Sequence, residues 1–540
     1  MPIFRKSFFC ILFVSGVLIF SSPAQANNLT ITNVSLETRD QGANTAIVEF
    51  DIDWENSWRD TENWDAAWVF FKVSKSGGNW VHGKMDASGT NPSDTSYGSG
   101  TSLTRYVPSD RAGALLYRSG TGTGDISNNN VRLKLDYGEA PVSAGDDDLI
   151  EVLVYGIEMV YIPTATYVLG FGGGEYGQSS YGPFVDACTS GDVDPVTITS
   201  SRPYVSSDSD GDGDCGDIGW HDWYGGSRPS SDTAVNANFP WGYYEYYLMK
   251  YELSQGQYRD FLNSLPSAYY SNRVASTTNN YYAMTNTTSP SHRNTIKYKS
   301  TGGPFVCDLD DDNTGDEAND GEWIAMNFVS VLDCWAFADW AGMRPATEME
   351  YEKACRGSGT SYVVEEPAHE SISWSRAKTP INSSGTNTET PSTMPYLINY
   401  DGYGSTTDGP LRVGFASTSS TSRTAAVAGY YGNMELSGNV YELYVGLGRS
   451  YAYVTYTGSH GDGILTSGSC QPGNATNSDW PLYNNTNCGC DGATKYGGFA
   501  ARGGSFDGTY HEVLLEDRYR GDYTTETRVF ENGCRFARDP

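Results

Sequence analysis

The segment ARGGSFDGTYHEVLLEDRYRGD occupies residues 501–522 of the 540-residue chain. It begins with Arg-Gly-Gly-Ser and an aromatic residue, ends with Arg-Tyr-Arg, and contains no cysteine. Aromatic rings, carboxylates and arginines together suit the binding of sugars or protein loops.

Three helices are predicted upstream of this segment from their N-terminal caps. Ser254 with Gln257, and Thr347 with Glu350, fit the capping box, in which each residue bonds the backbone N–H of the other. Ser330 can cap a third helix between them. Long loops rich in glycine, asparagine, serine and tyrosine connect these helices, so this part should be an α+β domain rich in loops.

The N-terminal part has a different pattern. The stretches TAIVEFDIDW (45–54), AAWVFFKVSK (66–75) and LIEVLVYGIEMVYIP (149–163) read as strands separated by polar turns. We therefore predict an all-β sandwich over residues 27–155, followed by the α+β domain over 156–540. The N-terminal part has no cluster of histidine, cysteine or carboxylate residues arranged for chemistry, which favours a structural or adhesive module.

Several motifs follow one another in a recognisable order. They are IEMVYIPTATYVLG (157–170), YYLMKYELSQGQYRDFLN (246–263), MRPATEMEYEKACRG (343–357), MELSGNVYEL (434–443), ARGGSF (501–506) and NGCRFAR (532–538). Together they resemble the formylglycine-generating enzyme, or sulfatase-modifying factor, family. The resemblance implies a variant of the C-type-lectin-like fold over residues 156–540. In lectin-like variable proteins with this fold, the segment after Arg-Gly-Gly-Ser contacts the ligand. The resemblance therefore implies a candidate ligand surface of Asp507, Tyr510, His511, Asp517 and Arg518.

The family's oxidase uses two cysteine thiolates that bind copper(I), and soft thiolates suit that ion. Their positions fall here within 507–512, which holds no cysteine. A second branch binds iron on three histidines, but no two of the six histidines here are spaced i, i+3 or i+4. We therefore expect neither copper nor iron, and no formylglycine-generating activity.

Calcium is the metal that the sequence favours. The family's calcium site maps onto Glu435, Gly438, Val440 and Glu442, and a second one onto Asn399, Tyr400 and Asp408. Independently of the family, Asp308, Asp310 and Asp312 alternate along an acidic stretch, as they do in calcium loops. A similar alternation runs over 208–214.

Charge and targeting signals restrict the partners. The net charge of −31 opposes binding to nucleic acid and suits divalent cations. Residues 1–26, MPIFRKSFFCILFVSGVLIFSSPAQA, have the basic start, short apolar run and small-residue site of a secretory signal peptide. We therefore expect an exported protein, extracellular or at the cell surface, without membrane insertion.

In an oxidising compartment the nine cysteines after the signal should mostly pair. Proximity in sequence suggests Cys188 with Cys215, Cys307 with Cys334, and Cys470 with Cys488 or Cys490. Glycosylation sequons are also present, and they matter only if the export route glycosylates: Asn28, Asn33, Asn286, Asn382, Asn474 and Asn484.

These observations favour an extracellular structural, adhesive or ligand-binding protein with a catalytically silent domain. Its partners would be an extracellular protein, a glycan, or further copies of itself in an assembly or filament. Two alternatives stay open. One is an oxidoreductase of the same family with a rearranged site, in which Cys470, Cys488 or Cys490 is reduced and faces the 501–512 loop. The other is a carbohydrate-binding surface protein.

Overall fold

The structure is a computed structural model that describes most of the chain beyond residue 27. The described residues are 28–170, 183–187, 195–207, 215–220, 229, 231–300, 303–358, 375–377, 381–391, 397–401, 408–417, 425–448, 452–468, 472–481, 498–509, 511–523 and 527–540. The predicted signal peptide and the acidic stretch 208–214 lie outside them, as do Tyr510 and Asn484. Within the described chain, no helix is both long and apolar enough to cross a bilayer.

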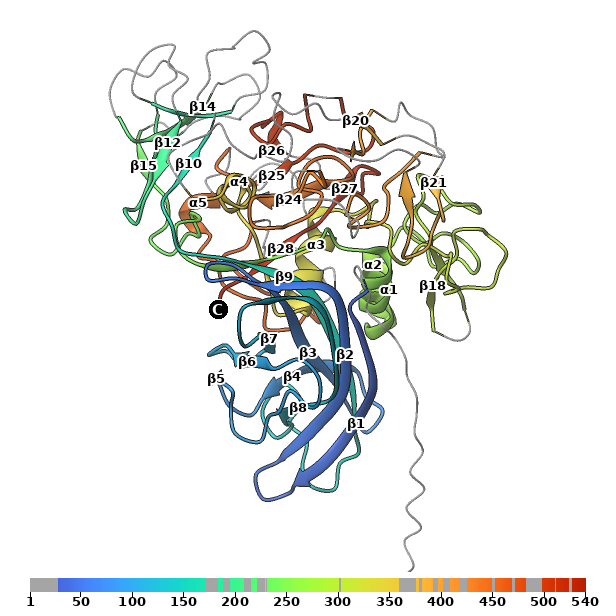
Figure 1. Cartoon of the computed structure of the whole chain (residues 1–540). Helices are drawn as coiled ribbons and strands as arrows, with labels where there is room; N and C mark the ends of the chain where they lie inside the picture. Colours follow the sequence, from blue (N-terminus) through green and yellow to red (C-terminus); the bar gives the residue numbers. More distant parts are fainter. Residues whose placement is uncertain are drawn as a thin grey trace, which may run out of the picture.

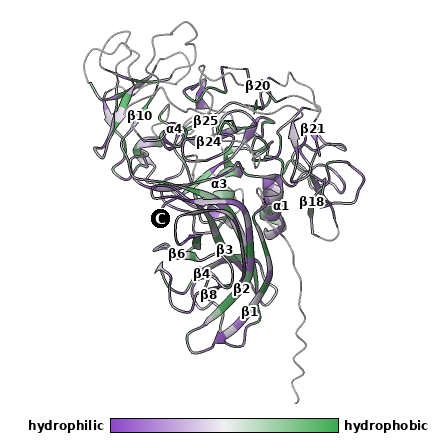
Figure 2. Cartoon of the chain, in the orientation of Figure 1, coloured by the Kyte–Doolittle hydropathy of each residue, from purple (hydrophilic) through white to green (hydrophobic). Residues whose placement is uncertain are grey.

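The N-terminal part consists of strands, as predicted. They are β1 (Thr30–Asp40), β2 (Thr45–Arg59), β3 (Asp65–Lys75), β4 (Trp80–Met85), β5 (Gly89–Thr90), β6 (Leu103–Val107), β7 (Ala114–Arg118) and β8 (Gly122–Asp136). Hydrophobic and polar residues alternate along β2 (Figure 2), and every second residue from Val48 to Trp54 is buried. This alternation places one side of the strand in a core and the other toward solvent.

Strand β9 (Ile150–Ile162) joins this part to the rest of the molecule (Figure 1). It pairs with β3 on one edge and with β16 (Tyr246–Met249) on the other, and β28 (Phe536–Arg538) and β19 (Arg344–Pro345) continue the sheet. The predicted boundary between residues 155 and 156 falls inside β9. The two parts therefore share one sheet.

Strand β3 is buried on both faces. Val69 and Phe71 pack into the core beneath β2 and β8, whereas Trp68 and Phe70 pack into the core that contains α3 (Val331–Trp340). The edge of the Trp340 ring meets Phe70, with ring centroids 5.1 Å apart. The N-terminal strands thus contribute to the core against which α3 packs.

The three predicted helices are present and begin where their caps were predicted. These are α1 (Gln255–Ser264), α3 and α4 (Glu348–Arg356), and each has both hydrogen bonds of a capping box. Two short helices that the sequence did not predict also occur, α2 (Ser267–Arg273) and α5 (Ala452–Thr455). The prediction of a mixed α+β part rich in loops is confirmed.

The remaining strands are short and form small sheets between loops. They are β10 (Tyr167–Leu169), β11 (Phe184–Asp186), β12 (Val196–Ile198), β13 (Tyr204–Val205), β14 (Ile218–Trp220), β15 (Thr233–Ala234), β17 (Ile296–Tyr298), β18 (Phe305–Cys307), β20 (Ser375–Arg376), β21 (Ile381–Asn382), β22 (Thr390–Pro391), β23 (Leu397–Ile398), β24 (Tyr441–Val445), β25 (Phe499–Arg502), β26 (Arg520–Tyr523) and β27 (Asn532–Gly533). One four-stranded sheet, in the order β26-β25-β24-β27, contains the family motifs of residues 434–443 and 501–506.

A cluster of buried polar side chains lies where the N-terminal strands meet the end of α3. Lys72 Nζ donates to the Trp340 carbonyl at 2.6 Å and lies 3.1 Å from His82 Nδ1. Asp339 accepts from the backbone N–H groups of Thr476 at 2.8 Å and Gly463 at 3.2 Å. Burial raises the pKa of Asp339 to about 7, even though these N–H groups oppose the rise. The proton on this carboxyl group is therefore coupled to folding.

This coupling predicts a pH-dependent stability. The pKa of Asp339 is 3.8 in its ordinary state and about 7 in the fold. The stability that the fold gains from the neutral Asp339 carboxyl group is therefore complete below pH 4. It is lost as the pH rises toward 7, by up to ~1.4 kcal/mol of unfolding free energy per pH unit. Urea unfolding between pH 4 and 8 would measure the slope. D339N cannot ionise, so it should give a flatter profile, whereas E62Q, which removes an exposed carboxylate, should keep the wild-type slope. An unchanged slope in D339N would contradict the assignment.

Candidate functional site

Strand β25 carries the start of the Arg-Gly-Gly-Ser motif, and its two glycines turn the chain back on itself. Gly503 and Gly504 have positive φ angles of 86° and 73°. A Cβ atom on Gly504 would lie 2.6 Å from the Glu512 carbonyl oxygen, closer than two such atoms can approach. Glycine is therefore required here, and Glu512 packs directly against the motif.

Carboxylates hold the loop at the place where the family oxidase has its thiols. Glu512 accepts hydrogen bonds from the Tyr441 hydroxyl at 2.7 Å and from the Thr509 N–H at 2.5 Å. Arg520 lies 3.9 Å from the Tyr441 ring centroid and pairs with Glu531 at 2.8 Å. These side chains already bond one another and hold the loop in place. We call the hydrogen-bonded pair of Glu512 and Tyr441 the clasp.

The structure places two residues of the candidate ligand surface in the interior. Arg518 is fully buried, 3.8 Å from the centre of the Phe184 ring, and its Nε donates to Glu348 at 2.8 Å. Asp517 is also buried. A sugar or a protein loop cannot reach either side chain, so both leave the candidate surface. Asp507 and His511 are half-buried and remain in it.

Arg518 belongs to a buried ion-pair network that sequence reasoning missed. Glu348 and Glu352, one turn apart on α4, face Arg502 at 3.0 and 2.7 Å, and Glu348 also pairs with Arg518. Burial alone would raise the pKa of Glu348, but the two guanidinium groups outweigh it and hold the pKa below its ordinary value. The i, i+4 spacing of these two glutamates on a predicted helix was the available signal.

The turn at 434–443 brings buried carboxylates together. Glu442 pairs with Arg535 at 2.6 Å, and Glu252 accepts the N–H of Val440 at 3.1 Å. Glu435 accepts the Gly414 N–H at 2.7 Å through Oε2, while its buried Oε1 has no hydrogen-bond partner. Burial raises the pKa of Glu435 to about 7. An orphaned carboxylate oxygen of this kind fits a hard cation, although Arg535 already neutralises Glu442.

The second set of family calcium residues lies next to this turn. Gly438 has a φ of 78°, and a Cβ atom there would lie 2.6 Å from the Asn399 carbonyl oxygen. The Asn399 amide donates to Asn439 at 3.0 Å, and the Asp408 carbonyl oxygen lies 3.2 Å from His292 Nδ1. Tyr400 packs against the small cluster around Ile398. The structure thus brings Asn399 beside Gly438, and calcium binding here stays a prediction.

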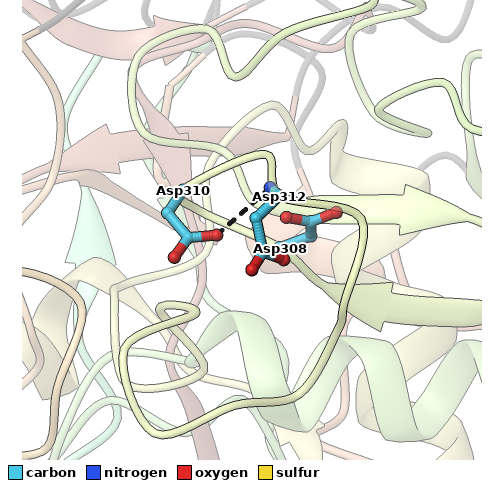
Figure 3. Close-up of side chains that lie close together, drawn as sticks. All are labelled: Asp308, Asp310 and Asp312. Carbon is cyan, nitrogen blue, oxygen red and sulfur yellow. Dashed lines mark hydrogen bonds between the residues drawn. The ribbon is translucent and has the colours of Figure 1, made fainter.

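The acidic loop after β18 draws three aspartates together (Figure 3). Carboxylate oxygens of Asp308, Asp310 and Asp312 all lie within 4.8 Å of one another. Asp308 is fully buried, and Asp310 and Asp312 are exposed. Burial also raises the pKa of the neighbouring Asp320 to about 6, and the charges of Asp310 and Asp308 add to the rise.

The disulfide pattern corrects one prediction. Cys334 is bonded to Cys534, with their Cα atoms 6.0 Å apart, whereas Cys307 is a buried thiol. The predicted Cys307–Cys334 pair is therefore wrong, because the fold brings the end of the chain, and not the nearer cysteine, against α3. Cys355 is a second buried thiol, and Cys215 is disulfide-bonded. Cys188, Cys470, Cys488 and Cys490 lie outside the described residues.

Five of the six sequons fall in described positions. Asn33, Asn286 and Asn382 are exposed, and Asn28 is half-buried. Asn474 is also half-buried, and its side-chain oxygen accepts a hydrogen bond from Arg273 at 2.6 Å. The first three are therefore the positions at which a glycan would meet least obstruction.

The glycine turn, the clasped loop and the buried Arg502–Glu348 network are parts of one α+β domain. Residues 240–540, which contain all of them, match the family model of the sulfatase-modifying factor enzyme 1-like domain. Since the match covers more than half of the chain, the protein belongs to the sulfatase-modifying factor family, as the motifs suggested. No curated protein matches the chain significantly.

Proposed function

We propose that this chain is an exported, catalytically silent member of the sulfatase-modifying factor family that serves as an extracellular structural or binding protein. The observation that carries the proposal is the Glu512–Tyr441 clasp, which stands where the family oxidase needs a pair of thiols. Carboxylate, phenol and guanidinium groups are poor ligands for copper(I), which prefers soft thiolates. Residues 507–512 therefore lack the thiolates on which the oxidase chemistry depends.

Three further features support an extracellular role. The Cys334–Cys534 disulfide suits an oxidising compartment. The sheet that continues from β3 through β9 into β16 makes the two parts mechanically continuous, as a structural subunit requires. The net charge of −31 favours solubility and opposes close packing of copies unless cations neutralise it.

Calcium at the Glu435 turn is part of this proposal, whereas copper and iron are not.

An activity assay tests the silent site. Purified protein, loaded with copper(I) in air, should convert no cysteine to formylglycine in a sulfatase-derived peptide, because residues 507–512 offer no thiolate. A catalytically competent family member run in parallel shows that the assay works. Turnover that disappears on alkylation of the thiols would instead establish the alternative, an oxidoreductase with a rearranged site.

The mode of action is tested by light scattering and electron microscopy of the exported chain, with calcium and after chelation. Filaments or regular particles would identify a structural subunit. A stable monomer would identify a surface binder, and a glycan array would then separate carbohydrate recognition from binding to proteins. Particles that dissociate on chelation would show that cations neutralise the charge between copies.

A further inference from the structure

The loop of residues 308–320 carries an excess of negative charge that the surrounding protein does not balance. Residues 308–322 contain eight carboxyl groups: Asp308, Asp310, Asp311, Asp312, Asp316, Glu317, Asp320 and Glu322. Two cations contact them directly among the described residues. Lys297 pairs with Asp308 and Asp311, and Arg259 pairs with Asp316 and Glu322. No lysine or arginine of the described chain pairs with Asp310, Asp312 or Asp320.

The loop is closed at its base. The Cys307 N–H donates to the Asp316 side chain at 2.9 Å, and the Asp316 N–H donates to the Cys307 carbonyl at 2.9 Å. Asp311 and Asn313 have positive φ angles of 60° and 73°, so the chain turns sharply between the aspartates. Asp308, Asp310 and Asp312 therefore gather on one side. The Asp311 carboxylate instead turns to Lys297, at 2.6 Å.

Two buried oxygen atoms in this region have no hydrogen-bond partner. Asp308 Oδ2 accepts from Lys297 at 2.8 Å, but its Oδ1 is buried and unbonded. Asp320 Oδ2 accepts the Glu317 N–H at 2.8 Å, and its Oδ1 is likewise buried and unbonded. A buried oxygen without a partner destabilises the fold, and it does so more strongly when it carries charge. Two such oxygens beside an acidic cluster point to a ligand that supplies positive charge.

We propose that Asp308, Asp310 and Asp312 bind one Ca²⁺ ion, at a site separate from the Glu435 turn. Oxygen ligands lie 2.3–2.6 Å from Ca²⁺, so two ligands on opposite sides of it are about 4.8 Å apart. The three clustered aspartates meet this limit. Mg²⁺ demands near-ideal octahedral geometry and dehydrates reluctantly, so calcium is favoured.

The ion would fasten this loop to the neighbouring hairpin of β21 and β22. The Gly321 N–H, next to Asp320, donates to the Gly385 carbonyl at 3.0 Å, and a Cβ atom on Gly385 would lie 2.1 Å from the Asn319 carbonyl oxygen. The two segments therefore touch closely. Calcium at the loop should stabilise both, and this holds whether or not the domain is catalytically silent.

The double variant D310N/D312N tests the proposal by calorimetric titration of the full exported chain with Ca²⁺. Both residues are exposed, so the fold should survive, which circular dichroism checks. We expect one class of calcium site to weaken by at least about tenfold, because two ligand charges are removed. The calcium-dependent rise in the unfolding midpoint should shrink in parallel.

Two control variants make the result specific. D311N removes one charge from the same loop, but its carboxylate faces Lys297, so the affinity should change by less than about threefold. E435Q alters the other candidate site and should leave this class intact. Equal losses in D311N and D310N/D312N would show diffuse attraction by an acidic loop and overturn the site. The site would also be overturned if D310N/D312N left every calcium-binding step of the wild-type titration unchanged.

Discussion

The variant E348Q should lose about 3–5 kcal/mol of unfolding free energy, which is a large share of the stability of a typical domain. Glu348 pairs with Arg502 at 3.0 Å and with Arg518 at 2.8 Å, and all three side chains are fully buried. A neutral amide leaves two guanidinium groups with one carboxylate, that of Glu352. Breaking a buried pair costs more than the pair contributes, because the remaining charge stays out of water.

Thermal and urea unfolding measure this loss, with E49Q as the matched control. Glu49 pairs with Arg132 on the surface, where the arginine side chain is 51% exposed, so the loss there should be below about 1 kcal/mol. The variant E348Q/R518M should recover part of the loss, since the buried Arg518 guanidinium is then no longer left without its carboxylate. Similar losses in E348Q and E49Q would mean that the network does not hold the domain together.

The pH dependence of E348Q provides a second check. The pKa of Glu348 is held below its ordinary value of 4.5, although burial acts in the opposite direction. The carboxylate therefore stabilises the fold above pH 4.5, and this contribution is lost as the pH falls through its lowered pKa. The difference between wild type and E348Q should be largest near neutral pH and should shrink in acid.

The variant C334S/C534S should lose about 4–5 kcal/mol, since the disulfide closes a loop with a sequence separation of 200 residues. In the unfolded chain this cross-link removes a large amount of conformational freedom. It also ties α3 to the segment between β27 and β28, near the end of the chain. Scanning calorimetry with and without a reductant measures the loss.

The reductant comparison provides the control for this disulfide. Wild type should lose most of the same stability when reduced, whereas C334S/C534S should respond only through its other disulfides, such as that of Cys215. If the reductant lowers the unfolding temperature of both proteins equally, the Cys334–Cys534 bond contributes little to stability. The proposal of export into an oxidising compartment then loses one of its supports.

Local features of the sequence determined much of the fold. The capping boxes of Ser254 and Thr347 begin α1 and α4 because their hydrogen bonds join residues only three apart. The alternation in 45–54 gave β2, since a strand shows successive side chains to opposite faces. The ordered motifs led to the family, which the match over 240–540 confirms. The missing thiols of residues 507–512 are likewise a property of the sequence alone.

The tertiary structure decided which distant residues meet. It paired Cys334 with Cys534, buried Arg518 against Phe184 and Glu348, and placed β3 in two cores at once. It also brought a carboxylate oxygen of Asp308 within 4.8 Å of those of Asp310 and Asp312. Each of these depends on how sheets and helices pack over separations of many residues. Spacing along the chain encodes hydrogen bonds within a turn, but charge burial and disulfide pairing follow from contacts that only the packed chain creates.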